Sequence, residues 1–188
     1  MPARLPYTGN TAADELISAD PLALLVGFAL DQQVTVQKAF SGPWEIQRRL
    51  GRFDARTLAL MDPADLDRTF RERPAIHRFP GSMAGKVQAL CAFIVERYDG
   101  DAARIWGEAK DGRDLQKRLL ELPGFGEMKA RTVLSVLAKR YGVSLPGMDA
   151  VVPKHPTLGD VDSPEALASY QAGKRAYKAS MRAQGKRV

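Results

Sequence analysis

The chain has 188 residues, of which 45% are hydrophobic, so a single domain can bury a core without disulfides or bound metals. Its 28 Lys and Arg outnumber its 22 Asp and Glu, and the formal charge of +6 favours a polyanionic partner, although an ordinary basic soluble protein can have the same charge. Cys91 is the only cysteine, which excludes an internal disulfide, a four-cysteine zinc site and a cysteine-ligated iron-sulfur cluster. Without a signal peptide or an apolar run that could cross a bilayer, we expect a cytoplasmic protein that does not enter a membrane.

Three helix starts are marked by a capping side chain followed by proline, at Asp20-Pro21, Asp62-Pro63 and Ser163-Pro164. Nearly every residue from Leu22 to Leu30 is apolar, which indicates a central helix enclosed by its neighbours. Further helical patterns cover residues 34–40, 43–50, 54–61, 63–71, 81–98, 102–106, 114–121 and 127–141, and the sequence Ser41-Gly42-Pro43 is expected to separate the first two of these. No alternating run of strand length stands out, so we predict an all-α domain of nine or ten short helices.

The turn Leu122-Pro123-Gly124-Phe125-Gly126 lies between two of the predicted helices. Its glycines permit backbone conformations and close approaches that a side chain would obstruct. Exposed amide groups at such a turn, with the positive end of the helix that starts near Glu127, can bind a phosphate oxygen. Leu122 and Phe125 would hold the turn in the core. A plain helix connection, with glycines that only end the first helix, is the alternative interpretation.

The sequence resembles the helix-hairpin-helix superfamily of DNA glycosylases, which includes endonuclease III and the adenine, oxoguanine and alkyladenine glycosylases. The resemblance lies in the hairpin 122–126 followed by Ala130, in Asp149 after the second hairpin helix, and in Leu30-Asp31-Gln32-Gln33 at the end of the apolar helix. Lys86, within Gly85-Lys86-Val87-Gln88-Ala89-Leu90, also matches the helix that precedes the hairpin. These elements span residues 22–152.

The resemblance implies a two-lobed all-α fold with a cleft between the lobes. A central lobe would comprise about residues 31–141, with the hairpin unit at 114–141, and a second lobe would combine residues 1–30 with 150–188. The implied activity is base excision: a monomeric, nucleoid-associated enzyme extrudes a damaged or mismatched base from duplex DNA and hydrolyses its N-glycosidic bond. The partner would be double-stranded DNA that contains the lesion.

The resemblance also implies the roles of individual residues. Asp149 would share a cavity with the hairpin, stabilise positive charge on the sugar and direct a water molecule, although helix capping is the alternative role. Gln33, or Gln32 beside it, would fill the space left by the extruded base, and a surface amide at a helix end is the plain alternative. Leu122, Gly124, Phe125, Gly126, Lys86 and Lys129 would contribute to DNA binding.

Bifunctional relatives have a Schiff-base lysine at the position that Met128 occupies here, so a monofunctional enzyme is expected. Lys129 is the next residue, and a rotation of roughly 100° along the helix should aim it away from the same cleft, toward a phosphate beside the hairpin. Two alternatives stay open: a helix-hairpin-helix DNA-binding protein that has lost catalysis, and a glycosylase with lyase activity through Lys129. Pro153 raises the first, because a helix after Asp149 must be short, shifted or absent.

No cofactor is expected to be required, and the resemblance implies at most a potassium or sodium ion held by hairpin carbonyls. The single cysteine excludes the iron-sulfur cluster of endonuclease III. Phe28, Trp44, Trp106 and His77 could contact an extruded base, but aromatic residues in apolar stretches are usually core residues. The final helix has Lys and Arg but no acid from Gln171 onward, and its segment 174–178 could lie against DNA or in solvent.

Overall fold

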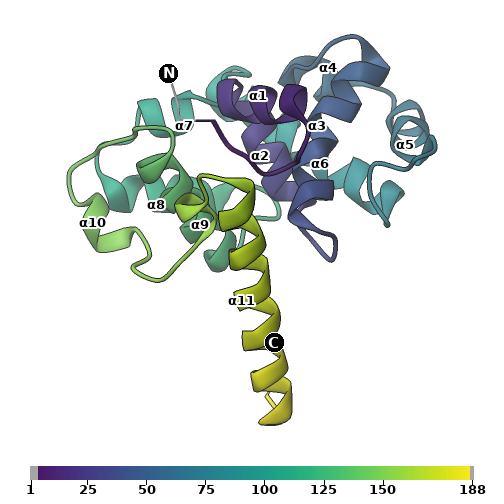
Figure 1. Cartoon of the computed structure of the whole chain (residues 1–188). Coiled ribbons are helices and arrows are strands. Elements are labelled where there is room, and N and C mark those ends of the chain that lie inside the picture. Colours follow the sequence, from purple (N-terminus) through teal and green to yellow (C-terminus); the bar gives the residue numbers. More distant parts are fainter. Residues whose placement is uncertain (1–3, 187–188) are drawn as a thin grey trace.

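The structure is a computed structural model and describes residues 4–186, within which it contains helices and no strand (Figure 1). The helices in chain order are α1 (Thr11–Ala19), α2 (Pro21–Leu30), α3 (Val36–Leu50), α4 (Ala55–Leu60), α5 (Pro63–Arg71), α6 (Pro80–Tyr98), α7 (Arg104–Gly107), α8 (Gly112–Glu121), α9 (Glu127–Lys139), α10 (Met148–Val151), the 3₁₀ helix η1 (Leu158–Asp160) and α11 (Pro164–Ala183). The predicted all-α class is confirmed. Within residues 4–186, no helix has both the length and the apolar character needed to cross a membrane.

The proline-marked helix starts are confirmed in atomic detail. The Asp20 carboxylate accepts hydrogen bonds from the amides of Leu22 and Ala23 at 2.8 and 3.3 Å, which caps α2. Asp62 caps α5 and Ser163 caps α11 in the same manner. These side chains bond the first-turn amides that have no partner inside the helix, so local sequence fixes where the helices begin.

Helix α2 lies at the centre of the molecule, as its composition predicts. Every residue from Leu22 to Leu30 is buried, and α2 packs against α1, α3 and α6. The approach of α3 is close, since a Cβ atom on Gly27 would overlap the ring of Phe40 and one on Gly42 would overlap the side chain of Leu30. Small residues at these two positions therefore allow the two helices to cross with their backbones near each other.

Helix α3 corrects one prediction, because it runs unbroken from Val36 to Leu50 with Pro43 inside it. Proline in a helix interior loses one backbone hydrogen bond and costs roughly 3 kcal/mol. Phe40, Pro43 and Ile46 share the buried face of the helix at helical spacing. Packing of this face against α2 stabilises the continuous helix despite the proline, which a local breaker signal does not reveal.

Helices α4 and α5 pack on α6, whereas a second group of helices forms around α9, which packs against α8, α10 and η1. The N-terminal segment joins this group, because the Tyr7 hydroxyl donates to the Leu158 carbonyl at 2.6 Å and the Tyr141 hydroxyl donates to the Ile17 carbonyl at 2.5 Å. One continuous set of buried apolar residues extends through both groups. The Tyr7 hydrogen bond connects residues 1–30 with residues 150–188, whereas α2 is enclosed by α3 and α6, and the division into two lobes stays a prediction.

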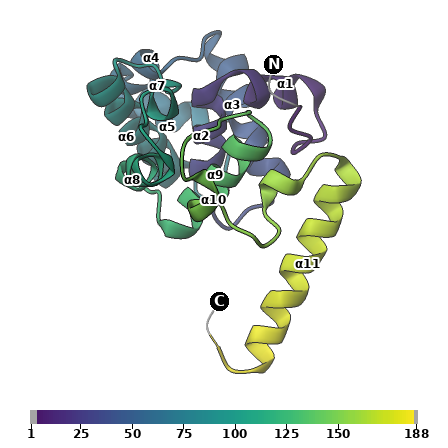
Figure 2. The same cartoon turned by 90° about the vertical axis from the view of Figure 1, so that its left-hand side faces the viewer.

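Helix α11 extends away from the rest of the molecule (Figures 1 and 2). Leu167 is its only buried residue. Its main attachments are at its beginning, where it follows η1, and at Gln171, whose side-chain amide exchanges hydrogen bonds of 2.8 and 3.2 Å with that of Gln37 in α3. Most of α11 is therefore held by few contacts.

Candidate nucleic-acid interface

The predicted hairpin joins α8 to α9. Leu122 and Phe125 are buried at 2% and 5% exposure, which confirms that they hold the turn in the core. The Phe125 amide donates to the Leu122 carbonyl at 3.0 Å. Gly124 has a φ of +80°, a conformation that favours glycine. Both hairpin glycines are exposed, and a Cβ atom on either would have no neighbour within 4 Å, so one side of the turn is open.

The N-terminus of α9 is part of this open side. Gly126 is its N-cap residue and provides no capping side chain. The first backbone hydrogen bond of α9 is the one that the Ala130 amide donates to the Gly126 carbonyl at 2.9 Å. The amides of residues 127–129 precede this bond and lie at the positive end of the helix. The phosphate-oxygen site expected at these amides, like the ion at the hairpin carbonyls, stays a prediction.

Four polar residues from three distant segments come together beside the hairpin, and we call Asp31, Gln32, Lys86 and Lys129 the junction cluster. The Lys86 ammonium donates to the Gln32 side-chain oxygen at 2.8 Å. The Lys129 Nζ lies 5.3 Å from the centre of the Phe125 ring, and its pKa responds to the charges of Asp31 and Lys86. The structure thus brings together Gln32, Lys86, Phe125 and Lys129, which the sequence linked only by resemblance.

Lys129 has an orientation opposite to the expected one. Its Nζ atom is buried and has no hydrogen-bond partner among the described residues. Burial lowers the pKa of Lys129 to about 8, against the raising effect of the Asp31 carboxylate. Met128 is instead the exposed residue, at 87%. The Lys129 ammonium is therefore turned inward and not toward a surface phosphate.

Asp31 was not singled out from the sequence, although it follows the most buried helix of the chain. Burial raises the pKa of its carboxyl group, against the lowering effect of the ammonium groups of Lys174, Lys129 and Lys178. Lys174 and Lys178 belong to α11, so this helix lies near the junction cluster. The proximity of a partly buried acid to a partly buried amine is an arrangement that single-sequence patterns do not predict.

The two candidate glutamines differ in setting. Gln32 is partly buried and bonded to Lys86, whereas Gln33 is exposed and has a φ of +56°, which is uncommon for a residue other than glycine. The nearby His77 side chain is 1% exposed, and its Nε2 atom lies 3.1 Å from the Leu30 carbonyl and 3.0 Å from that of Gln32. His77 thus fixes the backbone that leads to Gln33, and it is a core residue.

Asp149 is exposed and belongs to the four-residue helix α10, whose shortness confirms the expectation from Pro153. The Gly112 amide at the start of α8 donates to the Pro146 carbonyl at 2.9 Å, which places α10 against the end of α8 that is far from the hairpin. Helix α8 has ten residues, so this end lies about 15 Å from the hairpin. The structure does not bring Asp149 to the hairpin or to the junction cluster, so the expectation that Asp149 shares a cavity with the hairpin is wrong.

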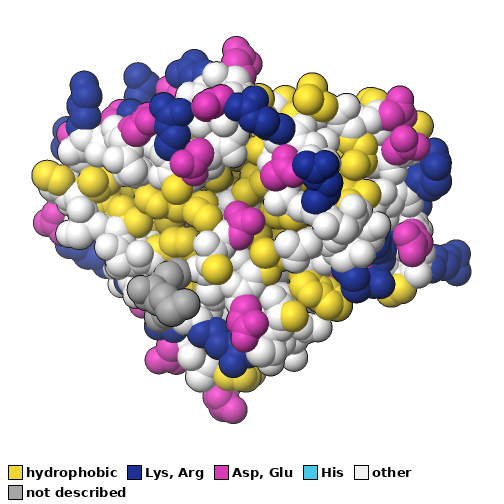
Figure 3. Space-filling view, turned by 90° about the horizontal axis from the view of Figure 1, so that it is seen from above, with side chains coloured by type: hydrophobic (Ala, Val, Ile, Leu, Met, Phe, Trp, Pro, Cys, Tyr) yellow, Lys and Arg dark blue, Asp and Glu magenta, His cyan; other side chains and the backbone are white. Residues whose placement is uncertain are grey.

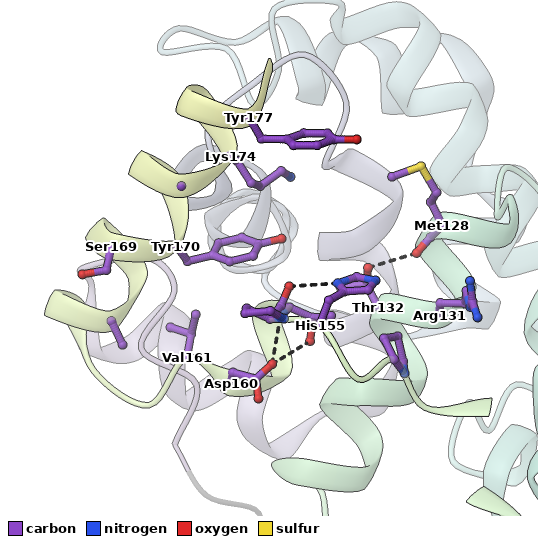
Figure 4. A pocket seen from close by; sticks show the side chains of 15 residues that line it. Met128, Arg131, Thr132, His155, Asp160, Val161, Ser169, Tyr170, Lys174 and Tyr177 are labelled. Atoms are coloured by element: carbon purple, nitrogen blue, oxygen red, sulfur yellow. Dashed lines mark hydrogen bonds between the residues drawn. The ribbon is translucent and has the colours of Figure 1, made fainter. Parts of the chain in front are cut away.

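A groove of about 920 Å³ separates α11 from α9 and from the loop that precedes η1 (Figure 4). Tyr170, Lys174 and Tyr177 line it on the α11 side, and the opposite wall includes Met128 and Arg131 from α9. We call this feature the α9–α11 groove. Its tyrosines were not predicted as functional residues; the signal was their spacing with Lys174 at positions i, i+4 and i+7 of a basic helix, which share one face.

Other predicted candidates lie outside these sites. Phe28 is buried in α2, and the partly buried Trp106 packs edge-to-face against Tyr141 at 6.0 Å between ring centres. On the face opposite the free end of α11, Lys and Arg side chains are interspersed with Asp and Glu (Figure 3). That face therefore offers a polyanion no uniformly positive surface.

Comparisons of the chain with protein-family models, with curated proteins and with solved structures found no match. The resemblance to helix-hairpin-helix glycosylases therefore depends on the motif residues alone.

Proposed function

We propose that the protein binds duplex DNA through the hairpin 122–126 and acts in base-excision repair, as a glycosylase that removes a damaged or mismatched base. The observation that carries the DNA-binding part is the open side of the hairpin, where glycines 124 and 126 leave space beside the uncapped start of α9. Backbone amides at a helix start bind phosphate without a basic side chain. The junction cluster lies beside the hairpin, so its polar groups would be close to the DNA strand whose phosphate the hairpin binds.

The substitution Gly126→Ala tests the DNA-binding proposal. Gly126 has a φ of −83° and a ψ of 178°, which alanine adopts freely, and the added methyl group meets no protein atom within 4 Å. The fold should therefore persist while the methyl group obstructs the phosphate. We expect affinity for a labelled duplex to fall by about tenfold or more, the loss of one good hydrogen bond to a charged group. Gly107→Ala, at the end of α7, is the matched control, because Gly107 is also exposed, has no positive φ and leaves an added methyl group without a neighbour within 4 Å. Equal affinities for Gly126→Ala and native protein would refute the site.

The catalytic part of the proposal assigns the charge-stabilising carboxylate to Asp149. Because Asp149 lies about 15 Å from the hairpin along α8, a strand bound at the hairpin would meet it about four nucleotides away, at 3.4 Å per nucleotide. Duplexes with alkylated, deaminated, oxidised and mismatched bases, followed by alkaline cleavage, test the activity. Base release by native protein and its loss in Asp149→Asn would support the role, whereas undiminished release would remove it. Lesion-dependent binding without release would favour a non-catalytic DNA-binding protein.

The junction cluster favours a second candidate, a glycosylase with lyase activity. The buried Lys129 amine, with its pKa lowered to about 8, is a stronger nucleophile near neutral pH than an exposed lysine. The buried Nζ must first swing outward by a rotamer change; it can then add to the C1′ aldehyde of an abasic site and form an imine with loss of water. Borohydride trapping of a covalent adduct by native protein and by the control Lys117→Gln, but not by Lys129→Gln, would support this candidate. Equal trapping by Lys129→Gln would exclude it.

A further inference from the structure

The α9–α11 groove exposes apolar surface that the fold does not use. Tyr177 is 60% exposed and Met128 is 87% exposed, and both line the groove from opposite sides (Figure 4). Large apolar side chains that face each other across an open groove mark a binding surface more often than a structural one. Since α11 buries only Leu167, its inner face is available to an occupant other than the protein core.

The side chains on the α11 side combine flat rings with positive charge. Tyr170, Lys174 and Tyr177 follow one another along one face, and the Lys174 Nζ lies 5.4 Å from the centre of the Tyr170 ring. Neither tyrosine hydroxyl forms a hydrogen bond within residues 4–186. Rings that alternate with a cation suit a ligand that itself alternates planar groups with negative charges.

The net charge of the groove is positive, although Asp160 also lines it. The Asp160 carboxylate is bound to the Lys139 ammonium at 2.6 Å and accepts the Thr157 amide at 2.8 Å. Arg131 and Lys174 form no ion pair in the described part of the chain. Lys174 has the Asp31 carboxylate in its vicinity but no bonded acid, and Arg131 has none either, so the net positive charge of the groove favours an anionic ligand.

We infer that the α9–α11 groove binds unpaired nucleotides of a DNA strand, with bases against Tyr170 and Tyr177 and phosphates near Lys174 and Arg131. The inference rests on the proposed function for the identity of the nucleic acid. Met128, in the groove wall, is only two residues from Gly126, so a strand held at the hairpin continues directly into the groove. A volume of about 920 Å³ is in the range of pockets for small ligands and accommodates nucleotides but not a duplex.

The test is the affinity of the full chain for a fluorescein-labelled thymidine oligomer of about 12 nucleotides, measured by anisotropy. Tyr177→Ala should weaken binding by about tenfold, the effect of one lost base-ring contact, while Tyr177→Phe keeps the ring and should stay within about twofold of native protein. Tyr177 is mostly exposed, so both variants should fold, which circular dichroism checks.

Two adjacent cations on α11 provide a matched control. Lys174→Gln and Arg175→Gln each remove one positive charge at adjacent positions, but only Lys174 lines the groove. Lys174→Gln should weaken oligomer binding by severalfold more than Arg175→Gln. Equal effects of the two variants would overturn the inference, as would native protein that does not bind the oligomer or a Tyr177→Ala variant that binds it normally.

A fully paired duplex separates this inference from the proposed function. Gly126→Ala should weaken duplex binding, whereas Tyr177→Ala should leave it within about twofold. Loss of oligomer binding in Tyr177→Ala together with duplex binding that is insensitive to Gly126→Ala would support the groove and refute the hairpin. Self-association that disappears in Tyr177→Ala, measured by sedimentation without DNA, would identify a second copy of the chain as the occupant and overturn the inference.

Discussion

His77 connects the end of α2 to the start of α6 through both ring nitrogens. Its Nδ1 atom accepts the Phe79 amide at 3.0 Å, so the proton of the neutral ring is on Nε2, which faces the carbonyls of Leu30 and Gln32. Protonation would place an N–H group opposite the Phe79 amide and remove that hydrogen bond. The neutral ring is therefore required for this connection, and it fixes the segment that precedes Gln33.

The stability of the protein should fall in acid partly because of His77. Burial lowers the pKa of His77 below its ordinary value of about 6.5, so the unfolded chain binds this proton more tightly than the folded chain. Its contribution to the free energy of unfolding is complete above about pH 6.5 and is lost as pH falls below that value. Urea unfolding of native protein and His77→Gln at pH 7 and pH 5 measures the effect.

Between these two pH values native protein should lose about 1 kcal/mol more than His77→Gln. The comparison cancels the carboxyl groups, which titrate alike in both proteins. The variant should also be less stable at pH 7 by about 1 to 3 kcal/mol, because the carbonyls of Leu30 and Gln32 lose a buried donor. Parallel pH dependences for the two proteins would show that His77 titrates equally in the folded and unfolded states.

The inward direction of Lys129 is indicated by the helical periodicity of the sequence but not by the family motif. Lys129, Val133 and Val136 are spaced as one helical face, and both valines are fully buried, so the apolar period of α9 already indicates an inward Lys129. Resemblance to the family motif directed attention to Met128 instead. Asp31 is different, because its closeness to Lys129 depends on how α2 and α9 pack and has no local signal.

At the scale of elements, helix starts were predictable because capping is local. Asp20, Asp62 and Ser163 each cap the helix that follows them, as the adjacent prolines indicated. Pro43 was misjudged because the packing that tolerates it comes from α2, a different element. The hairpin was predictable from its glycines, whereas the position of α10 at the far end of α8 depends on the path of the loop between α9 and α10.

Helix α11 should have a steep gradient of local stability. Its beginning is held by Leu167 and by the Gln171 side chain, but residues 172–183 bury nothing, and a helical segment of that length is marginal in water on its own. Hydrogen exchange followed by mass spectrometry should show little protection over residues 172–183, clear protection over 164–170 and the strongest protection in α2. Uniform protection along α11 would contradict this gradient, and added thymidine oligomer should slow exchange near Tyr177 if the groove binds it.

At the scale of the whole molecule, α11 contributes a run of positive charge without an acid from Gln171 onward. Many other cations form ion pairs, such as Arg71 with Asp67 at 2.6 Å, while Arg175, Lys178 and Arg182 form none within the described residues. Each such cation that contacts a phosphate of duplex DNA releases counterions and steepens the salt dependence of binding by about 0.9 in a plot of log K against log salt. Contacts by hairpin amides carry no charge and release none of their own.

Removal of the three α11 cations should therefore change the slope of log K against log salt, whereas obstruction of the hairpin by Gly126→Ala should not. The variant Arg175→Gln, Lys178→Gln, Arg182→Gln should reduce the slope for a fully paired duplex by about 2 to 3, if all three contact phosphates. Gly126→Ala should weaken binding equally at about 50 and 200 mM salt and keep the native slope. A native slope in the triple variant would mean that α11 points away from the bound duplex. DNA attraction would then depend on cations elsewhere, whereas a slope lowered by Gly126→Ala would show that the hairpin orients basic side chains and does not act through its amides alone.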